Sequence, residues 1–241
     1  MADNIIPRRR FLVGAGLAST AVAAGLASEV PAPAQAETVA APPPPHAAAE
    51  PEPLLMLTAT EAAFITAVVD TLIPADELSP SGSDCGIVTF IDRQLASDWG
   101  GGAKMYRSGP FHKGKPEQGY QLALTPRQFF QTGIAEANAW SQKTYGKELD
   151  RLSPPDRVAA LKAMEEGKAE FVSLSSRAFF NSLLSITMEG FFSDPAHGGN
   201  RNCVSWKMLG FPGLPATYAQ KFEAYRDKRY VAPPRSMVDF S

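Results

Sequence analysis

Hydrophobic residues recur every three or four positions along most of the chain after residue 54, which is the spacing of a helix face that packs on a core. No stretch alternates as a half-buried strand would, and no internal repeat is visible. The spacing predicts helices over residues 58–73, 87–96, 126–145, 154–166, 171–189 and about 216–228. We therefore predict an all-α fold, a single small helical domain of five or six helices over residues 54–241.

Local signals mark where these helices begin. Thr58 with Glu61 and Thr125 with Gln128 have the spacing of a capping box, and a proline follows Ser153 at the first helical position. The predicted stops are Pro74, Gly146, Gly167 and Gly190.

The same spacing predicts which side chains face the core. The expected inward residues are Val158, Leu161 and Met164. In the long helix Phe179, Leu183 and Ile186 form one stripe, and in the last helix Tyr218, Phe222 and Tyr225 are spaced by four and three.

Residues 99–121 have no period and form an unusually long predicted loop. Such a loop is either a binding segment or disordered. It carries Trp99, Tyr106, Phe111 and Tyr120, and these aromatic residues favour binding, because a disordered spacer rarely contains them.

The N-terminal residues have the composition of an export signal rather than of a fold. A basic start is followed by an uncharged, apolar or small run over residues 11–26 and then by the small-x-small pattern of Ala34 and Ala36. A twin-arginine signal, which exports folded proteins, is indicated by Arg8, Arg9, Phe11 and Leu12.

We therefore predict a twin-arginine signal peptide over residues 1–36 and a Pro/Ala-rich disordered linker over residues 37–53. Two other interpretations are open: a basic disordered tail on a cytosolic protein, and a signal that is kept as a membrane anchor.

Composition and charge exclude several function classes. The formal net charge of the 241 residues is −2, so the overall positive charge typical of nucleic-acid-binding proteins is missing. Two cysteines and three histidines are too few for a cysteine-rich zinc site, an iron–sulfur cluster or a disulfide scaffold. Cys85 and Cys203 either form one disulfide or remain free thiols. No motif for c-type haem, for a zinc protease, for a serine hydrolase or for a P-loop is present.

The most unusual run covers residues 187–213, where tight-turn residues stand among large aromatic side chains. Asp194 and Asn200 can satisfy turn amides, whereas Phe191, Phe192, Trp206 and Phe211 are too many aromatics for a solvated loop. About half of these aromatics are expected in the core, and the others at a partner.

This run resembles the signature of the gluconate 2-dehydrogenase subunit 3 family. The matching motifs are Glu189-Gly190-Phe191-Phe192, Gly198-Gly199-Asn200-Arg201 and Trp206-Lys207-Met208 followed by Gly210-Phe211-Pro212-Gly213. The resemblance extends back through residues 70–76, 109–111 and 119–121. The chain has His197 where the family often has tyrosine, and Ser205 where it often has glycine.

The resemblance implies a small gamma subunit that is not catalytic by itself and binds no cofactor or metal. In such complexes a large flavoprotein of the glucose-methanol-choline type holds FAD, and a cytochrome c subunit with several haems passes electrons to the membrane quinones. The small subunit carries the twin-arginine signal to the translocase and escorts the folded large subunit. The expected location is the periplasm, at the inner membrane through the complex.

The partner interface is then expected within the aromatic run. Its predicted residues are Phe191, Phe192, Asp194, Asn200, Arg201, Trp206, Lys207 and Phe211.

Two other functions are open. The chain could be an independent periplasmic enzyme that uses Asp194, His197 and Arg201 as an acid/base or metal site. It could also be a binding module in which the loop over residues 99–121 clasps a sugar by aromatic stacking.

Overall fold

The computed structural model describes residues 53–112, 114–115, 118–215, 217 and 219–240. The described residues form six α-helices: α2 (Ala59–Leu72), α3 (Ile87–Ala96), α4 (Pro126–Tyr145), α5 (Pro154–Glu165), α6 (Ser176–Phe192) and α7 (Val204–Leu209). Short 3-10 helices occur at η2 (Leu149–Arg151), η3 (Pro195–His197), η4 (Arg201–Cys203), η5 (Ala219–Lys221) and η6 (Met237–Phe240). Within these ranges there is no named strand, only an isolated bridge between Gly213 and Arg235. The all-α prediction is confirmed.

The helices begin where their capping residues predict. The Glu61 carboxylate accepts hydrogen bonds from the backbone N–H and the hydroxyl of Thr58, and the Thr58 hydroxyl accepts one from the Glu61 N–H. Thr125 and Gln128 form the same reciprocal pair before α4. Each box satisfies two of the backbone groups that a helix start leaves without an intrahelical partner.

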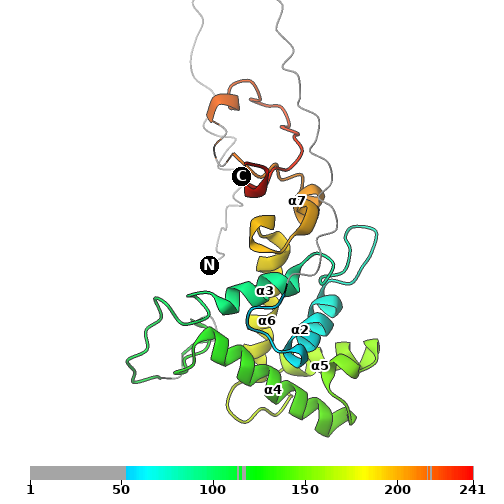
Figure 1. Ribbon diagram of the computed structural model, residues 1–241, viewed down its shortest axis with the longest axis vertical. Coiled ribbons are helices and arrows are strands. Elements are labelled where there is room, and N and C mark those ends of the chain that lie inside the picture. The colour runs from blue at the N-terminus through cyan, green and yellow to red at the C-terminus, as the bar shows by residue number, and fades with distance from the viewer. Residues whose placement is uncertain (1–52, 113, 116–117, 216, 218, 241) are drawn as a thin grey trace, which may run out of the picture. The chain divides into compact units, whose positions relative to one another are not determined.

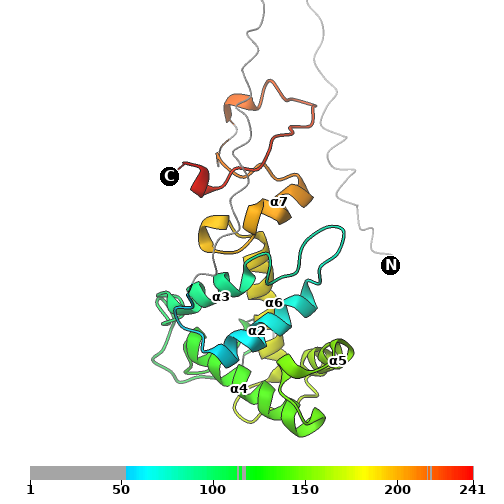
Figure 2. The same ribbon diagram turned by 45° about the vertical axis from the view of Figure 1, so that its right-hand side comes forward.

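Helix α6 is the centre of the fold, because α2, α3, α4, α5 and α7 all contact it (Figures 1 and 2). Phe179 of α6 is fully buried, and its ring lies 6.0–6.2 Å from the rings of Phe64, Phe129 and Phe130. A Cβ on Gly133 of α4 would overlap the Phe179 ring. Glycine at this point therefore lets two helices approach closely around the aromatic core.

A short strap before α2 is tied to α3 by one carboxylate. Asp92 is 2% exposed and accepts hydrogen bonds from the backbone N–H groups of Leu55, Met56 and Leu57 at 2.6, 3.0 and 2.8 Å. Leu57 is itself part of the hydrophobic core. Residues 55–57 are thus held on α3 before the chain enters α2.

Three predicted details of the middle helices are wrong. Helix α6 begins at Ser176 rather than at residue 171, because the Ser175 hydroxyl caps the Ala178 N–H. Gly190 lies inside α6 without the positive φ of a helix-ending glycine, and the helix continues to Phe192. In α5, Val158 is 43% exposed, since the buried face consists of Ala160, Leu161 and Met164.

The predicted helix over residues 216–228 is also wrong. The described part of this stretch contains only η5 (Ala219–Lys221) followed by turns, and Asp227 has a φ of 61°. Phe222 and Tyr225 are exposed, so no core packing stabilises a helical stripe here.

The predicted signal over residues 1–36, and the linker over 37–53 apart from its last residue, lie outside the described residues. None of the described helices has the length and apolar character that crossing a membrane requires.

Candidate partner-docking surface

The turn between α6 and α7 is organised around Asn200. This residue is fully buried with a φ of 46°, and its side-chain N–H donates to the Ser193 carbonyl at 2.9 Å. Its side-chain oxygen accepts hydrogen bonds from the Ser205 backbone N–H at 3.0 Å and from the Ser205 hydroxyl at 2.9 Å. Asn200 therefore joins the end of α6 to the start of α7 from within.

Arg201 fixes the same turn to α3. Its backbone N–H donates to the Cys85 carbonyl at 3.0 Å, and its guanidinium donates to the Thr89 hydroxyl at 3.4 Å. The side chain is half-buried against Gly86, at the start of α3. Arg201 thus contributes to packing within the chain.

The aromatic residues of the run mostly point inward. Phe191 is buried, and its ring packs edge-on against Phe192 at 5.0 Å. Trp206 is 7% exposed and donates its indole N–H to the Phe192 carbonyl at 3.0 Å, and its ring packs edge-on against Phe211 at 5.1 Å. Of the eight predicted interface residues, only Lys207 and Phe211 are exposed. Their contact with a partner stays a prediction.

Asp194 holds the end of the chain. Its carboxylate accepts hydrogen bonds from the Ser236 hydroxyl at 2.6 Å, from the Met237 N–H at 3.1 Å and from the Ala196 N–H at 2.9 Å. His197 is exposed, and no side-chain hydrogen bond or ion pair of the described structure joins it to Asp194 or Arg201. The three residues of the alternative enzyme site are therefore close in sequence, but in the described structure Asp194 and Arg201 bond to other parts of the chain.

Beyond these inward residues lies a segment that we call the C-terminal arm, residues 207–240, which is orange to red in Figure 1. Its base is closed, because the Leu214 N–H donates to the Arg235 carbonyl at 2.8 Å and the Arg235 N–H donates to the Pro212 carbonyl at 3.1 Å. Gly213, with a φ of 68°, lies against both the Arg235 backbone and the Trp206 ring, where a Cβ would overlap. The arm is thus a closed loop that Asp194 and Trp206 hold in place.

The arm exposes much apolar surface. Leu209 is 62% exposed and Phe211 46% exposed, and both lie at its start. The exposed large hydrophobic residues of the arm are Met208, Leu209, Phe211, Phe222, Tyr225, Val231, Met237, Val238 and Phe240. Exposed apolar residues in such number mark interaction surfaces, because a solvated loop gains nothing from them.

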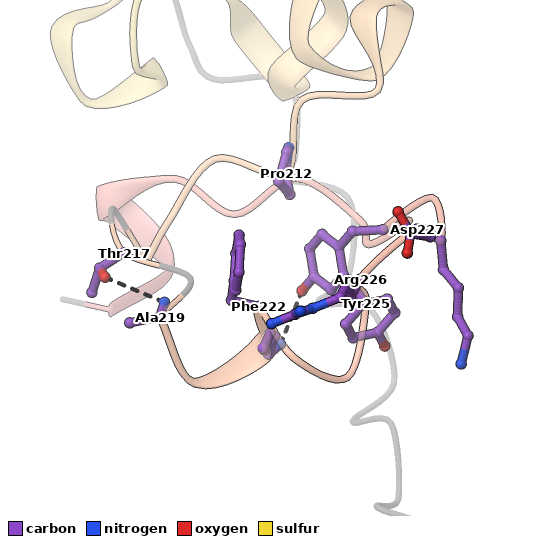
Figure 3. Close-up of a pocket in the computed structure, with 10 residues that line it drawn as sticks. Pro212, Thr217, Ala219, Phe222, Tyr225, Arg226 and Asp227 are labelled. Carbon is purple, nitrogen blue, oxygen red and sulfur yellow. Dashed lines mark hydrogen bonds between the residues drawn. The ribbon is translucent and has the colours of Figure 1, made fainter. Parts of the chain in front are cut away.

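Residues of the arm line an open hollow of about 970 Å³. In Figure 3, Phe222 projects toward Pro212 across this hollow, and Tyr225 and Arg226 lie beside it. The volume is in the range of pockets that accept a side chain or a small molecule, about 300–1,000 Å³.

The sequence profile of gluconate 2-dehydrogenase subunit 3 matches residues 59–213. The chain belongs to this family. Membership implies association with a dehydrogenase complex. No curated protein and no solved structure matches the chain in the comparisons made. The matched range of this subunit 3 family member ends at Gly213, so most of the arm lies beyond it.

In this family member, part of the aromatic loop over residues 99–121 lines a second hollow. Phe111, Tyr120 and Gln121 face Asn181 and Ser182 of α6 around a groove of about 830 Å³, which Trp99 and Tyr106 do not line. The Tyr120 ring stacks on Phe129 at 4.0 Å, so this residue belongs largely to the core. Burial raises the pKa of the Tyr120 phenol.

The two cysteines are buried free thiols in the structure. Burial raises the pKa of both Cys85 and Cys203, because desolvation disfavours the thiolate. In the described part of the chain, no group of three or more His, Cys, Asp or Glu residues could hold a metal ion.

Sequence reasoning missed the exposed residues of the arm. It placed Phe222 and Tyr225 at helical spacing in a last helix, and it gave no role to Leu209 or Val231. A charge count by segment could have found the arm, because residues 207–240 hold six Lys or Arg and three Asp or Glu.

Proposed function

We propose that the chain is the small, non-catalytic subunit that docks on and stabilises the FAD-dependent large subunit of a dehydrogenase acting on a sugar acid or polyol. The observation that carries this proposal is the arm, where exposed apolar residues are presented on a loop closed at its base. A surface already held in its bound shape loses less conformational entropy on association. Family membership supports a dehydrogenase complex as the setting of this docking.

We assign direct contact to the exposed residues of the arm, which begins in the last turn of α7. The buried residues Asn200 and Trp206 support this surface from below. This division separates two kinds of variant: substitution of an exposed residue should weaken docking without loss of stability, whereas substitution of a buried one should also lower stability.

The test is co-expression of the tagged chain with the flavoprotein subunit of its complex, followed by co-purification and flavin absorbance at 450 nm. Leu209→Asp is expected to abolish recovery of the flavoprotein while helix content and melting temperature stay unchanged. Leu78→Asp is the matched control, because Leu78 is also strongly exposed but lies outside the arm. Equal recovery with Leu209→Asp and wild type would refute docking through the arm.

The proposal includes export of the partner as folded cargo into the periplasm by the twin-arginine translocase, with a cytochrome c subunit completing the complex at the inner membrane. The support is the sequence pattern around Arg8 and Arg9. Replacing both by lysine should leave the flavoprotein in the cytoplasm, measured by fractionation. A flavoprotein that still reaches the periplasm would refute the escort role, but not docking.

A sugar-binding function is the second candidate, and the groove of about 830 Å³ beside α6 favours it. Asn181, Ser182 and Gln121 offer amide and hydroxyl groups there, which suit polyols. Isothermal titration of the isolated chain with aldonic acids and polyols tests this, and Asn181→Leu should abolish any heat of binding. Absence of heat with the wild type would refute the candidate.

A further inference from the structure

The arm and the helical body carry opposite charge. Residues 207–240 contain six Lys or Arg and three Asp or Glu, whereas residues 54–206 contain fourteen Lys or Arg and seventeen Asp or Glu. The cations around the tip of the arm, such as Arg226 and Lys228, are exposed. The arm is therefore a basic loop on an acidic body, so its charge is directed to one surface.

Cations of the arm lie over its aromatic rings. Lys221 lies 5.1 Å from the ring centre of Tyr230, and its ammonium donates to the Tyr230 hydroxyl at 2.9 Å. The Arg226 guanidinium lies 5.9 Å from the ring centre of Phe222. At the base, the Arg235 guanidinium lies 4.1 Å from the ring centre of Phe240.

This stacking has a consequence for recognition. A guanidinium that lies over a ring keeps its charge and its edge N–H groups, which can still donate to a carboxylate. At the same time the ring limits the rotamers of the cationic side chain, so this side chain loses less conformational entropy when the arm binds a partner. Phe222 and Arg226 therefore present an apolar face and a positive charge side by side at the rim of the hollow.

We propose that the arm recognises an acidic surface of the partner subunit, and that one apolar side chain of the partner, flanked by carboxylates, enters the hollow beside Phe222 and Tyr225. This inference rests on the proposed docking function and specifies its chemistry. A protein partner fits better than an anionic lipid surface, because Glu223 and Asp227 lie among the cations and the hollow is concave.

The experiment measures the dissociation constant of the full-length chain for the purified flavoprotein subunit by biolayer interferometry at 50 and 500 mM NaCl. Arg226→Glu with Lys228→Glu should weaken binding by about 10- to 100-fold at low salt, because both charges then face carboxylates. The difference from wild type should fall below about threefold at high salt, where exposed charges are screened. The conservative pair Arg226→Lys with Lys228→Arg should bind within about threefold of wild type.

The matched control is Lys147→Glu with Lys162→Glu, which makes the same change in charge at exposed positions of the body. It should bind like wild type, so a loss specific to the arm excludes an effect of net charge alone. Ala219→Trp, which fills the hollow, should weaken binding by about tenfold at both salt concentrations, because its effect is steric. Melting curves confirm that each variant is folded.

The outcomes separate the two proposals. If the wild type binds and the double reversal at Arg226 and Lys228 binds equally well at low salt, the acidic-surface inference is wrong and docking stands. Equal binding by Ala219→Trp overturns the role of the hollow. A wild type that fails to bind the flavoprotein refutes docking and this inference together.

Two other occupants would also overturn the inference. Binding of the chain alone to phosphatidylglycerol vesicles, lost in the double reversal, would assign the arm to a lipid surface. A dimer of the isolated chain in sedimentation velocity that the same reversal dissociates would assign the arm to a second copy, whose acidic body would be the counter-surface.

Discussion

Replacement of Asp92 by alanine is expected to release the strap before α2 and to destabilise the whole fold. The Asp92 carboxylate is the acceptor for the N–H groups of Leu55, Met56 and Leu57, and it is almost completely buried. Alanine removes the acceptor and the charge together, and no neighbouring side chain of the strap supplies a new one.

The magnitude follows from the burial of each bond. The hydrogen bond to Leu57 is buried, so its N–H would be left without an acceptor at a cost of about 1–3 kcal/mol. The bonds to Leu55 and Met56 are only partly buried, and water can replace the carboxylate there, at a cost of about 0.5–1 kcal/mol each. The total of about 2–5 kcal/mol corresponds to a decrease in melting temperature of about 5–15 °C for a domain of this size. Asp92→Asn keeps one acceptor oxygen and should cost about half as much.

Urea unfolding followed by circular dichroism at 222 nm gives the free energy, with an unchanged slope against denaturant as the sign of unchanged cooperativity. Hydrogen exchange should show lost protection at the amides of residues 55–57. Asp98→Ala, at an exposed aspartate just beyond α3, is the control and should stay within about 0.5 kcal/mol of wild type. If Asp92→Ala is as stable as this control and keeps protection at residues 55–57, the carboxylate does not hold the strap.

Three further predictions concern packing, the arm and the thiols. Gly133→Ala should lower the urea midpoint, because overlap of the new Cβ with Phe179 costs about 1–3 kcal/mol, whereas alanine gains about 1 kcal/mol in helix propensity. An equal or higher midpoint would contradict the close approach of the two helices. Asp194→Ala should raise the rate of tryptic cleavage within the arm by about tenfold, because the arm loses about 1.4 kcal/mol of attachment through the Asp194 carboxylate. An unchanged rate would show that the base of the arm is held without this carboxylate. Because burial raises the pKa of Cys85 and Cys203, few thiolates are present at pH 8. Ellman's reagent should therefore react slowly with the native chain but promptly with both thiols in urea, and prompt reaction of the native chain would contradict their burial.

Much of the fold was predictable because helix ends depend on local chemistry. Thr58, Thr125 and Ser153 begin their helices through hydrogen bonds to residues within three positions, so the signal lies entirely in the sequence. The family signature could also be read from residues 189–213, and the profile match confirms it.

The remaining differences come from contacts between distant segments. Phe222 and Tyr225 have helical spacing, but Phe222 lies against Arg226 and Tyr225 packs edge-on against Tyr230, both within the arm. The closed base at Gly213 and Arg235 gives this stretch no core to cover. Trp206 is among the residues predicted at a partner, because the run holds more large aromatics than a solvated loop carries. Its indole N–H instead finds the Phe192 carbonyl, a partner that no local pattern reveals.

The strap on α3 also determines how the folded chain responds to a mechanical load. A pull on the residues before Leu54 reaches the Asp92 carboxylate before it reaches α2, and three hydrogen bonds to one side chain share the load. The force therefore passes into α3, whose Ile87, Phe90 and Ile91 lie in the core, and bypasses the first turn of α2. A tether attached at this end is expected to break the three hydrogen bonds to Asp92 and the core contact of Leu57 before α2 unravels.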